Sequence, residues 1–362
     1  MSDRNIDLLG FDVAESDEGS GGHDEQTRRQ RRTPPRRRRL RRALIIAGVL
    51  VLLVVLSVGG YVGYLGWKVS GNVTQAELLP SAPPPTTALD GTPIQVPAAG
   101  NGTNFLVVGA DSRGKNDRGR ADVIVLVHVP ADPTSIQMIH FPRDLFVAIP
   151  GHGKNKINAA YAYGGEPLLV ETIQNLVGIK IDHVARTDFD GFKNMTDAVG
   201  GVRVYAEEPN DASGNGGTAI KKGWNDLNGT QALAFVRERY ELSQGDISRG
   251  RRQLAFVKAL LLKATSPETI RNPLAIARFA DAATKNLVVD KGLSIGVMKD
   301  YALELRHIRA SDVVFATAPF TGFGSDPNAG SIDIVDTQGM KLLGDALRKD
   351  RMDDYLDVFV TP

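Results

Sequence analysis

Two apolar runs and the charged loop between them decide the fold of this chain: FLVVG at 105–109, ADSRGKNDRGRAD at 110–122 and VIVLVHV at 123–129. Both runs have the length and the β-branched content of buried strands. A glycine-rich, charged segment between two such strands is a loop. Ligand sites of α/β sheets favour loops at the ends of strands, so this loop is a candidate functional site.

The same reading extends along the chain as strands alternating with helices. Further strands are predicted at 135–141, 145–149, 183–188, 201–206 and 312–318. Helical periodicity is predicted at 157–177, 189–198, 229–239, 247–265, 272–286, 295–305 and 337–349. Interleaved strands and helices predict an α/β/α sandwich around a mixed central sheet.

The N-terminal part carries a membrane signal. Ten arginines lie within residues 28–42, and the next 25 residues, 43–67, contain no charge. At 1.5 Å per residue such a helix reaches about 37 Å, enough to cross a hydrocarbon core of about 30 Å. A cleaved signal peptide has an apolar run of only about 7–15 residues. We therefore predict one uncleaved transmembrane helix, cytoplasmic at its arginine-rich end, with the rest of the chain outside the cell.

These signals divide the chain into four parts. Residues 1–42 form a predicted disordered cytoplasmic tail, 43–67 the span, 68–103 a proline-rich extracytoplasmic stalk and 104–362 the catalytic domain. The arginine run alone would also suit a nucleic-acid tail, but next to a span it favours topology and contact with anionic lipid. No nucleic-acid partner is expected.

The composition excludes several kinds of chemistry. The 362 residues include no cysteine, so disulfide frameworks, cysteine-ligated metals and thiol nucleophiles are absent. Lysine and arginine number 43 against 42 acidic residues, a balance that hides the local clusters described next. The histidines show no metal-binding spacing.

The charged loop could hold a metal ion. Asp111 and Asp122 bracket four basic side chains, and two carboxylates can bind Mg²⁺ while arginines grip the phosphates that share the ion. A solvated loop with paired opposite charges is the simpler alternative. A second candidate is Arg143 in Phe141-Pro142-Arg143-Asp144, where proline marks a break between strands.

The densest cluster of charge opens an apolar helix. Arg237-Glu238-Arg239 ends one helical run, and another that is then apolar almost all round begins with Asp246, Arg249, Arg251, Arg252 and Gln253. Arg249 and Gln253 are one turn apart and share a face. The pattern fits a buried helix with a salt-bridged entrance, and it fits equally a site for an anionic head group with an apolar tail.

Several of these motifs, in this order, resemble the LytR-CpsA-Psr family of bacterial cell-wall ligases. The resemblance covers about 150 residues and is carried by the stretches 105–113, 118–122, 141–144, 156–161, 163–165, 199–202, 227–233, 237–239 and 246–253. One departure is Ala121, where serine or threonine is commoner in the family. Its side chain is not a metal ligand.

The resemblance implies an activity and the residues that carry it. Such proteins transfer a glycopolymer from polyprenyl pyrophosphate to a peptidoglycan hydroxyl through a phosphodiester. It implies that Asp111 and Asp122 hold Mg²⁺, or Mn²⁺, on the pyrophosphate. It further implies phosphate contacts by a set of arginines, with Gln253 as a neutral donor: Arg118, Arg120, Arg143, Arg237, Arg239 and Arg249. Asp246 is a candidate to orient an arginine or to accept the acceptor's proton, and a helix-capping role is equally open.

Two alternatives stay open at the level of sequence. A polyprenyl-pyrophosphate hydrolase would use water as the acceptor. A non-catalytic lipid-binding or regulatory membrane protein would bind the same lipid without turnover.

Overall fold

The computed structural model describes residues 56–57, 59–61, 63–81, 98–110, 119–213 and 217–356. The predicted tail 1–42, most of the predicted span 43–67 and most of the charged loop lie outside these residues. Within them, no helix is both long and apolar enough to cross a bilayer. One compact unit begins at Gly59 and contains every element described below.

A seven-stranded mixed sheet forms the centre of this unit, in the order β1-β10-β7-β2-β3-β4-β11. Its strands are β1 (Thr74–Ala76), β2 (Thr103–Ala110), β3 (Ala121–Val129), β4 (Ile136–His140), β7 (His183–Thr187), β10 (Val288–Asp290) and β11 (Val313–Thr317). The pair β2 and β3 is antiparallel over its whole length, whereas β7 and β11 run parallel to their neighbours β2 and β4. The prediction of a mixed central sheet is confirmed.

The alternation of side chains along β2 separates the two faces of the sheet. Leu106, Val108 and Ala110 are buried in the main core, which also contains residues of α2 (Ile157–Val177), α9 (Thr337–Arg348) and α10 (Met352–Leu356). Val107 and Gly109 point to the opposite face, where they line a cavity. Strand residues alternate between faces, so one strand serves both the core and a site.

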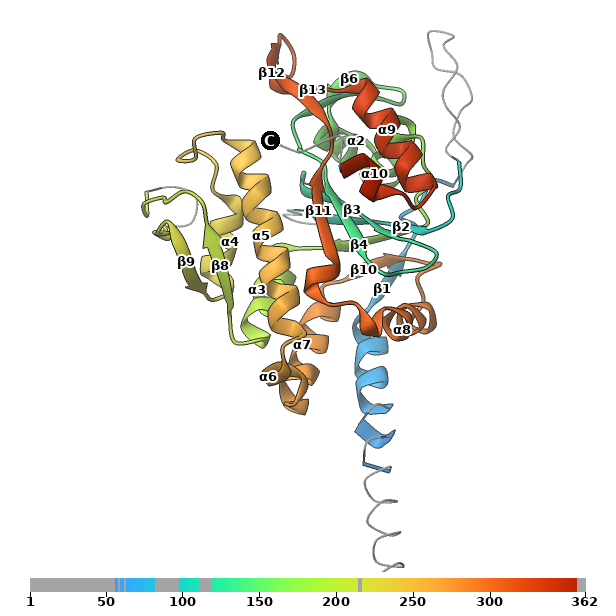
Figure 1. The fold of residues 1–362 in the computed structure, drawn as a ribbon, viewed down its shortest axis with the longest axis vertical. Helices are drawn as coiled ribbons and strands as arrows, with labels where there is room; N and C mark the ends of the chain where they lie inside the picture. The colour runs from blue at the N-terminus through green and yellow to red at the C-terminus, as the bar shows by residue number, and fades with distance from the viewer. Residues whose placement is uncertain are drawn as a thin grey trace, which may run out of the picture. The chain divides into compact units, whose positions relative to one another are not determined.

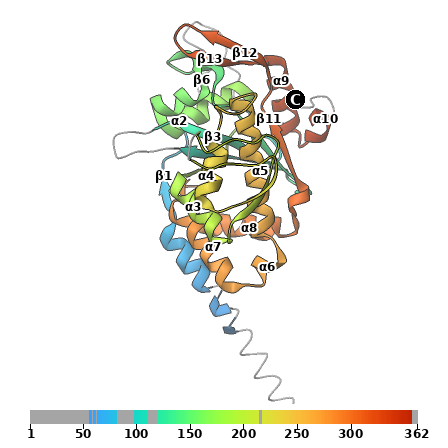
Figure 2. The ribbon, with the colours of Figure 1, turned by 90° about the vertical axis from the view of Figure 1, so that its left-hand side faces the viewer.

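The opposite face is covered by a second group of helices (Figures 1 and 2). These are α3 (Phe189–Ala198), α4 (Gly229–Arg237), α5 (Asp246–Ala264), α6 (Pro267–Ile270) and α7 (Pro273–Lys285). Strands β8 (Val202–Ala206) and β9 (Gly223–Leu227) pair as a hairpin and share a second apolar core with α4 and α5. The helix α5 therefore lies between this hairpin and the cavity.

The remaining elements lie at the ends of the unit. Helix α8 (Ile295–Glu304) and the short 3₁₀ turns Leu305–His307 and Ala310–Asp312 connect β10 to β11. A four-stranded sheet contains β5 (Leu145–Ile149), β6 (Gly153–Lys156), β12 (Phe320–Asp326) and β13 (Gly330–Val335).

In the described part of the chain, sequence reasoning missed six strands, β1, β6, β9, β10, β12 and β13; of these, β1 and β10 have three residues each, and β6 and β9 lack an apolar pattern. Strand β1 falls inside the range predicted as a stalk, and its three residues pair only with β10. Strands β6 and β9 contain mainly lysine, asparagine, aspartate and glycine. Their pairing is decided by the partner strand, which a local pattern does not reveal.

Candidate functional site

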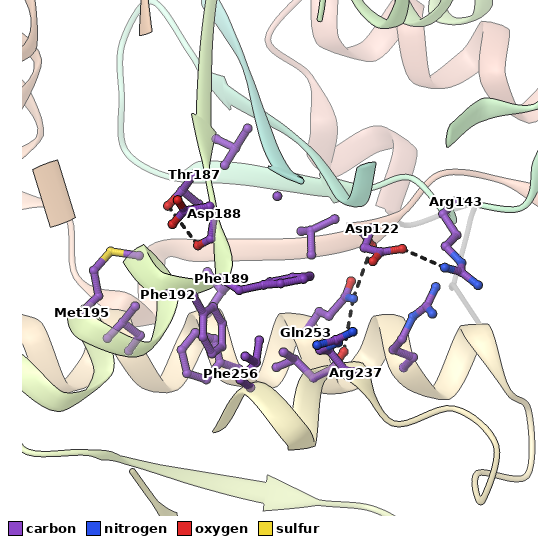
Figure 3. Close-up of a pocket in the computed structure, with 18 of the residues that line it drawn as sticks. Asp122, Arg143, Thr187, Asp188, Phe189, Phe192, Met195, Arg237, Gln253 and Phe256 are labelled. Carbon is purple, nitrogen blue, oxygen red and sulfur yellow. Dashed lines mark hydrogen bonds and ion pairs between the residues drawn. The ribbon is translucent and has the colours of Figure 1, made fainter. Parts of the chain in front are cut away.

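One cavity of about 370 Å³ opens between the sheet and helices α3, α4 and α5 (Figure 3). Its volume falls within the usual range for small-molecule sites. The charged residues that line it are Asp122, Arg143, Asp188, Arg237, Arg239 and Arg249. Apolar side chains line the rest of it, with Phe192 and Met195 at the end away from Asp122 and Arg143 in Figure 3: Val107, Val123, Phe189, Phe192, Met195, Leu233, Val236, Phe256, Val257 and Leu260.

Asp122 and Arg143 form an ion pair at the mouth. Asp122 is the second residue of β3, and its Oδ1 lies 2.7 Å from Nη1 of Arg143. The side chains are 23% and 14% exposed, so the pair is only partly screened by water. Figure 3 shows the pair beside the amide of Gln253.

The loop between β4 and β5 holds Arg143 in place. Lys156 Nζ lies 3.0 Å from Asp144 Oδ1, and Asp144 Oδ2 in turn lies 3.8 Å from Arg143 Nε. The backbone N–H of Asn158 donates to the carbonyl of Arg143 at 3.2 Å. The stretches 141–144 and 156–161 of the family resemblance therefore meet here, and the second positions the arginine of the first.

The end of α4 delivers two more arginines. A capping box between Asn228 and Gln231 starts this helix, and the turn after Arg237 is organised by Glu238, which is 1% exposed. Its Oε1 accepts hydrogen bonds from the backbone N–H groups of residues 239, 240 and 241 at 2.8, 2.8 and 3.2 Å. The buried carboxylate between the two arginines thus has a structural role, and Arg237 and Arg239 both reach the cavity.

Aromatic rings support these two cations. Arg237 lies 4.7 Å over the ring of Phe189, and Arg239 lies 4.6 Å over that of Tyr240. Arg239 Nη2 also donates to the Tyr240 hydroxyl at 2.7 Å. This hydrogen bond and the charge of Arg239 lower the pKa of Tyr240. A guanidinium held by a ring keeps its donors directed along its edge, toward a ligand.

The first turns of α5 contribute Arg249 and Gln253, as their spacing predicts. Gln253 Nε2 lies 3.4 Å from the carbonyl of Val236 and 3.5 Å from that of Asp122. These distances are at the long limit of hydrogen bonding, and the buried Gln253 side chain also hydrogen-bonds with His140.

The other two arginines of this turn do not line the cavity. Arg251 pairs with Glu207 at 3.0 Å. Arg252 donates to Asn210 Oδ1 and to the carbonyl of Glu208 at 2.7 and 2.8 Å. Both bind the segment after β8 on the far side of α5, so the arginine cluster read from sequence divides between a site and a structural contact.

A buried histidine on the sheet, His140, packs against α5 at Gly250. His140 ends β4, and a Cβ atom built on Gly250 would lie 2.7 Å from its Cε1. The glycine therefore lets the helix approach the sheet closely beside Arg249. Burial and the neighbouring Arg249 charge lower the pKa of His140 to about 4. The imidazole is thus neutral and adds no repulsion beside the arginine.

The structure leaves four of the predicted site residues away from the cavity or undescribed. Arg120 precedes β3, is exposed and does not line the cavity, because it lies beyond the strand end that carries Asp122. Asp111 and Arg118 fall outside the described residues. Gly245 is the N-cap of α5 and Asp246 is its first residue, so Asp246 does not occupy the predicted capping position; its side chain is not described. Among the described residues, no group of three or more acidic or histidine side chains could hold a metal ion.

Sequence reasoning also missed residues of the site. Asp188 lines the cavity and caps α3 by accepting from the N–H of Gly191 at 2.8 Å. Phe189 and Tyr240 stack on arginines, and His140 lies behind α5. Proximity in space brings these residues together, and only the capping pattern at Asp188 is visible locally.

Fold and site together define a mixed α/β protein with a cationic mouth that opens onto an apolar cavity. This is the form of a site for an amphiphile with an anionic head. The sequence model of the LytR_cpsA_psr family matches residues 77–349. The chain belongs to this family.

Individual relatives agree with this membership. The probable cell wall biosynthesis protein LcpB of Corynebacterium glutamicum is 35% identical over 277 residues, covering 72% of this chain and 64% of LcpB. The polyisoprenyl-teichoic acid–peptidoglycan teichoic acid transferase TagT of Bacillus subtilis is 34% identical over 176 residues, covering 46% of this chain and 54% of TagT. The chain thus spans about half to two thirds of the length of the curated relatives it matches.

Solved structures show the same fold. The crystal structure of B. subtilis TagV superposes with a TM-score of 0.59 at 28% identity, covering 72% of this chain and 99% of TagV. A structure of TagT bound to LI-WTA superposes with a TM-score of 0.55 at 27% identity, covering 68% and 90% of the two chains.

Proposed function

We propose that this protein is a phosphotransferase that moves a glycopolymer from a polyprenyl-pyrophosphate carrier to a peptidoglycan hydroxyl. The observation that carries the proposal is the junction of four arginines with an apolar cavity in one site: Arg143, Arg237, Arg239 and Arg249. The transferase names of relatives such as TagT agree with this activity.

The two parts of the cavity match the two parts of the donor. Planar guanidinium groups bind the oxygens of a pyrophosphate with paired hydrogen bonds. Phenylalanine, leucine and valine side chains deeper in the cavity suit isoprene units, and each buried methylene contributes about 0.8 kcal/mol. A free sugar phosphate would use only the first part, so the cavity favours a lipid-linked donor.

The reaction requires little covalent chemistry from the protein. The acceptor hydroxyl oxygen attacks the phosphorus that carries the glycan, and a new P–O bond forms. The bond to the bridging oxygen breaks, polyprenyl phosphate leaves with the electron pair, and the hydroxyl proton passes to a base or to water. The arginines stabilise the charge that grows on the leaving phosphate. Asp246 is our candidate for the group that orients an arginine or accepts this proton.

A divalent cation would fit the acidic side of the mouth. Asp122 is a partly buried carboxylate that lines the cavity, and its oxygens are the donors that Mg²⁺ and Mn²⁺ prefer. We propose that Asp111 and Asp122 hold the ion, which would neutralise part of the pyrophosphate charge. Arg118 and Arg120 belong to the same strand-end segment, and Arg120, which does not line the cavity, would contact a part of the donor that lies outside it.

The same proposal includes a place in the cell. Residues 43–67 would anchor the chain in the cell membrane as a single pass, with the N-terminus cytoplasmic and the catalytic domain outside. The partners would be the lipid-linked donor, peptidoglycan and membrane lipid.

Two matched arginine variants test the proposal. We expect Arg237→Ala to abolish transfer from a polyprenyl-pyrophosphate glycan to peptidoglycan, since Arg237 lines the cavity. Arg251→Ala removes an equal charge from the outer side of α5 and should retain transfer. The assay measures wall-bound glycan and released polyprenyl phosphate by mass spectrometry, with the full chain in detergent or nanodiscs.

The products distinguish the proposal from its alternatives. Free phosphorylated glycan without wall-bound product would identify a hydrolase. Bound lipid with no turnover in the presence of Mg²⁺ and acceptor would identify a lipid-binding protein. Equal activity of the two variants would show that the cavity is not the site of transfer.

A further inference from the structure

The helix that contains the end of the predicted span packs along α7. Its described residues up to Asn72 are helical, and the Tyr61 hydroxyl donates to the carbonyl of Pro273. Farther on, Lys68 Nζ lies 3.4 Å from Asp281 Oδ1, and Asn72 Nδ2 donates to the same oxygen at 2.9 Å. The contacts advance in the same direction along both helices, so the two run side by side and parallel.

This arrangement determines how far the start of α7 lies from the membrane–water interface. The predicted span ends at Trp67, and aromatic residues mark the membrane–water interface. Tyr61 lies six residues earlier, which is about 9 Å along a helix. Each interfacial layer is about 5–8 Å thick. Pro273, which contacts Tyr61, therefore reaches the boundary between head groups and acyl chains.

The surface around Pro273 has the chemistry of that boundary. We define the α5–α7 corner as residues 258–278, which include the end of α5, all of α6 and the start of α7. Leu262 and Leu274 are 51% and 58% exposed there. Single exposed leucines are common on the surfaces of soluble proteins. These two suggest membrane contact because they lie near the boundary between head groups and acyl chains.

Charge in the corner has one predominant sign. It contains four basic residues, Lys258, Lys263, Arg271 and Arg278, against one acidic residue, Glu268. Glu268 is already paired with Lys263 at 2.9 Å. Apolar side chains among basic ones are typical of surfaces that lie in an anionic membrane interface, where long cationic side chains reach the head groups.

We propose that the α5–α7 corner lies in the outer head-group layer of the membrane, with Leu262 and Leu274 against acyl chains. This inference rests on the membrane anchor of the proposed function. It also gives the carrier a route, because Leu260, which lines the cavity, itself belongs to the α5–α7 corner. A polyprenyl tail would pass from the bilayer into the cavity without crossing water.

The absence of cysteine makes a direct test possible. Single cysteines are introduced by Leu274→Cys and, as the matched control, by Phe323→Cys. Phe323 is 60% exposed on β12, at the end of the unit far from α6 and α7 in Figure 1. The full-length chain is labelled with an environment-sensitive fluorophore and placed in nanodiscs that contain anionic lipid. Quenching is measured with lipid-attached doxyl groups and with aqueous iodide.

At position 274 we expect several-fold stronger quenching by doxyl lipid and several-fold weaker quenching by iodide than at position 323. Equal iodide quenching at the two positions would overturn the proposal. Protection from iodide without doxyl quenching would also overturn it, because a second protein copy would then cover the corner. Transfer activity is measured in the same samples. An active enzyme whose label at position 274 is exposed to water would refute the placement of the α5–α7 corner in the membrane and leave the proposed function intact.

Discussion

Gly250→Ala tests how closely α5 must approach the sheet to place its arginine. The added Cβ would lie 2.7 Å from Cε1 and 3.0 Å from Nδ1 of His140. Alanine in place of glycine stabilises a helix interior by about 1 kcal/mol, whereas overpacking a core costs about 1–3 kcal/mol. We therefore expect a net loss of about 0–2 kcal/mol, together with weaker donor binding because Arg249 moves with the helix.

A matched glycine separates the clash from the gain in helix propensity. A Cβ at Gly296 in α8 would lie 3.6 Å from its nearest neighbour, the Ser294 hydroxyl, in ordinary contact. Gly296→Ala should gain up to about 1 kcal/mol, so the two variants should differ by about 1–3 kcal/mol. Thermal unfolding of the full chain in detergent measures this difference, at roughly 2–4 °C per kcal/mol for a domain of this order.

A double-mutant cycle identifies the cause. In a His140→Ala background the ring is gone, so Gly250→Ala should be neutral or stabilising, and the two substitutions together should destabilise the protein by less than the sum of their separate effects. If Gly250→Ala is at least as stable as Gly296→Ala in the wild-type background, the close approach of helix and ring has no energetic consequence and the reasoning is wrong.

Three further predictions concern pH, charge and packing. Burial lowers the pKa of His140 from 6.5 to about 4, so between these values the unfolded chain binds a proton that the folded chain does not. The free energy of unfolding should therefore fall by about 3 kcal/mol as the pH drops from 6.5 to 4, and an unchanged pH slope of Tm in His140→Gln would contradict this. Asp122→Asn removes the carboxylate partner of Arg143 and should abolish transfer with little loss of fold. If Asp122→Asn still forms wall-bound product, Asp122 is not required for transfer. Phe256 stacks on Phe192 at 4.2 Å in the cavity wall, and Phe256→Ala should cost about 3–5 kcal/mol and weaken donor binding. If Phe256→Ala lowers Tm by less than Gly250→Ala does, the packing of Phe256 in the cavity wall contributes little to stability.

The sequence predicted the main elements because their signals are local. Helices α2 and α3 have the predicted limits, and the apolar runs at 105–109 and 123–129 form the core of two paired strands. Hydrophobic periodicity over ten or more residues survives in any tertiary context that buries one face. The short strands β1 and β10 carry no such pattern; β1 pairs with β10, and β10 also pairs with β7.

The site shows the same division between local pattern and tertiary placement. The spacing of Arg249 and Gln253 was enough to put both on one face of α5, and both line the cavity. The sequence did not distinguish Arg249 from Arg251 and Arg252, whose carboxylate and carbonyl partners come from the segment after β8.

The sequence by itself determined the family, the mixed α/β fold and the set of charged motifs, because each can be recognised from short contiguous segments of residues. Only the tertiary structure decided which charges meet. Glu238 is buried as a structural anion, Asp122 pairs with Arg143, and Arg120 stays outside the cavity. A side chain's role depends on what surrounds it in space, and burial and distance between remote segments fix those surroundings.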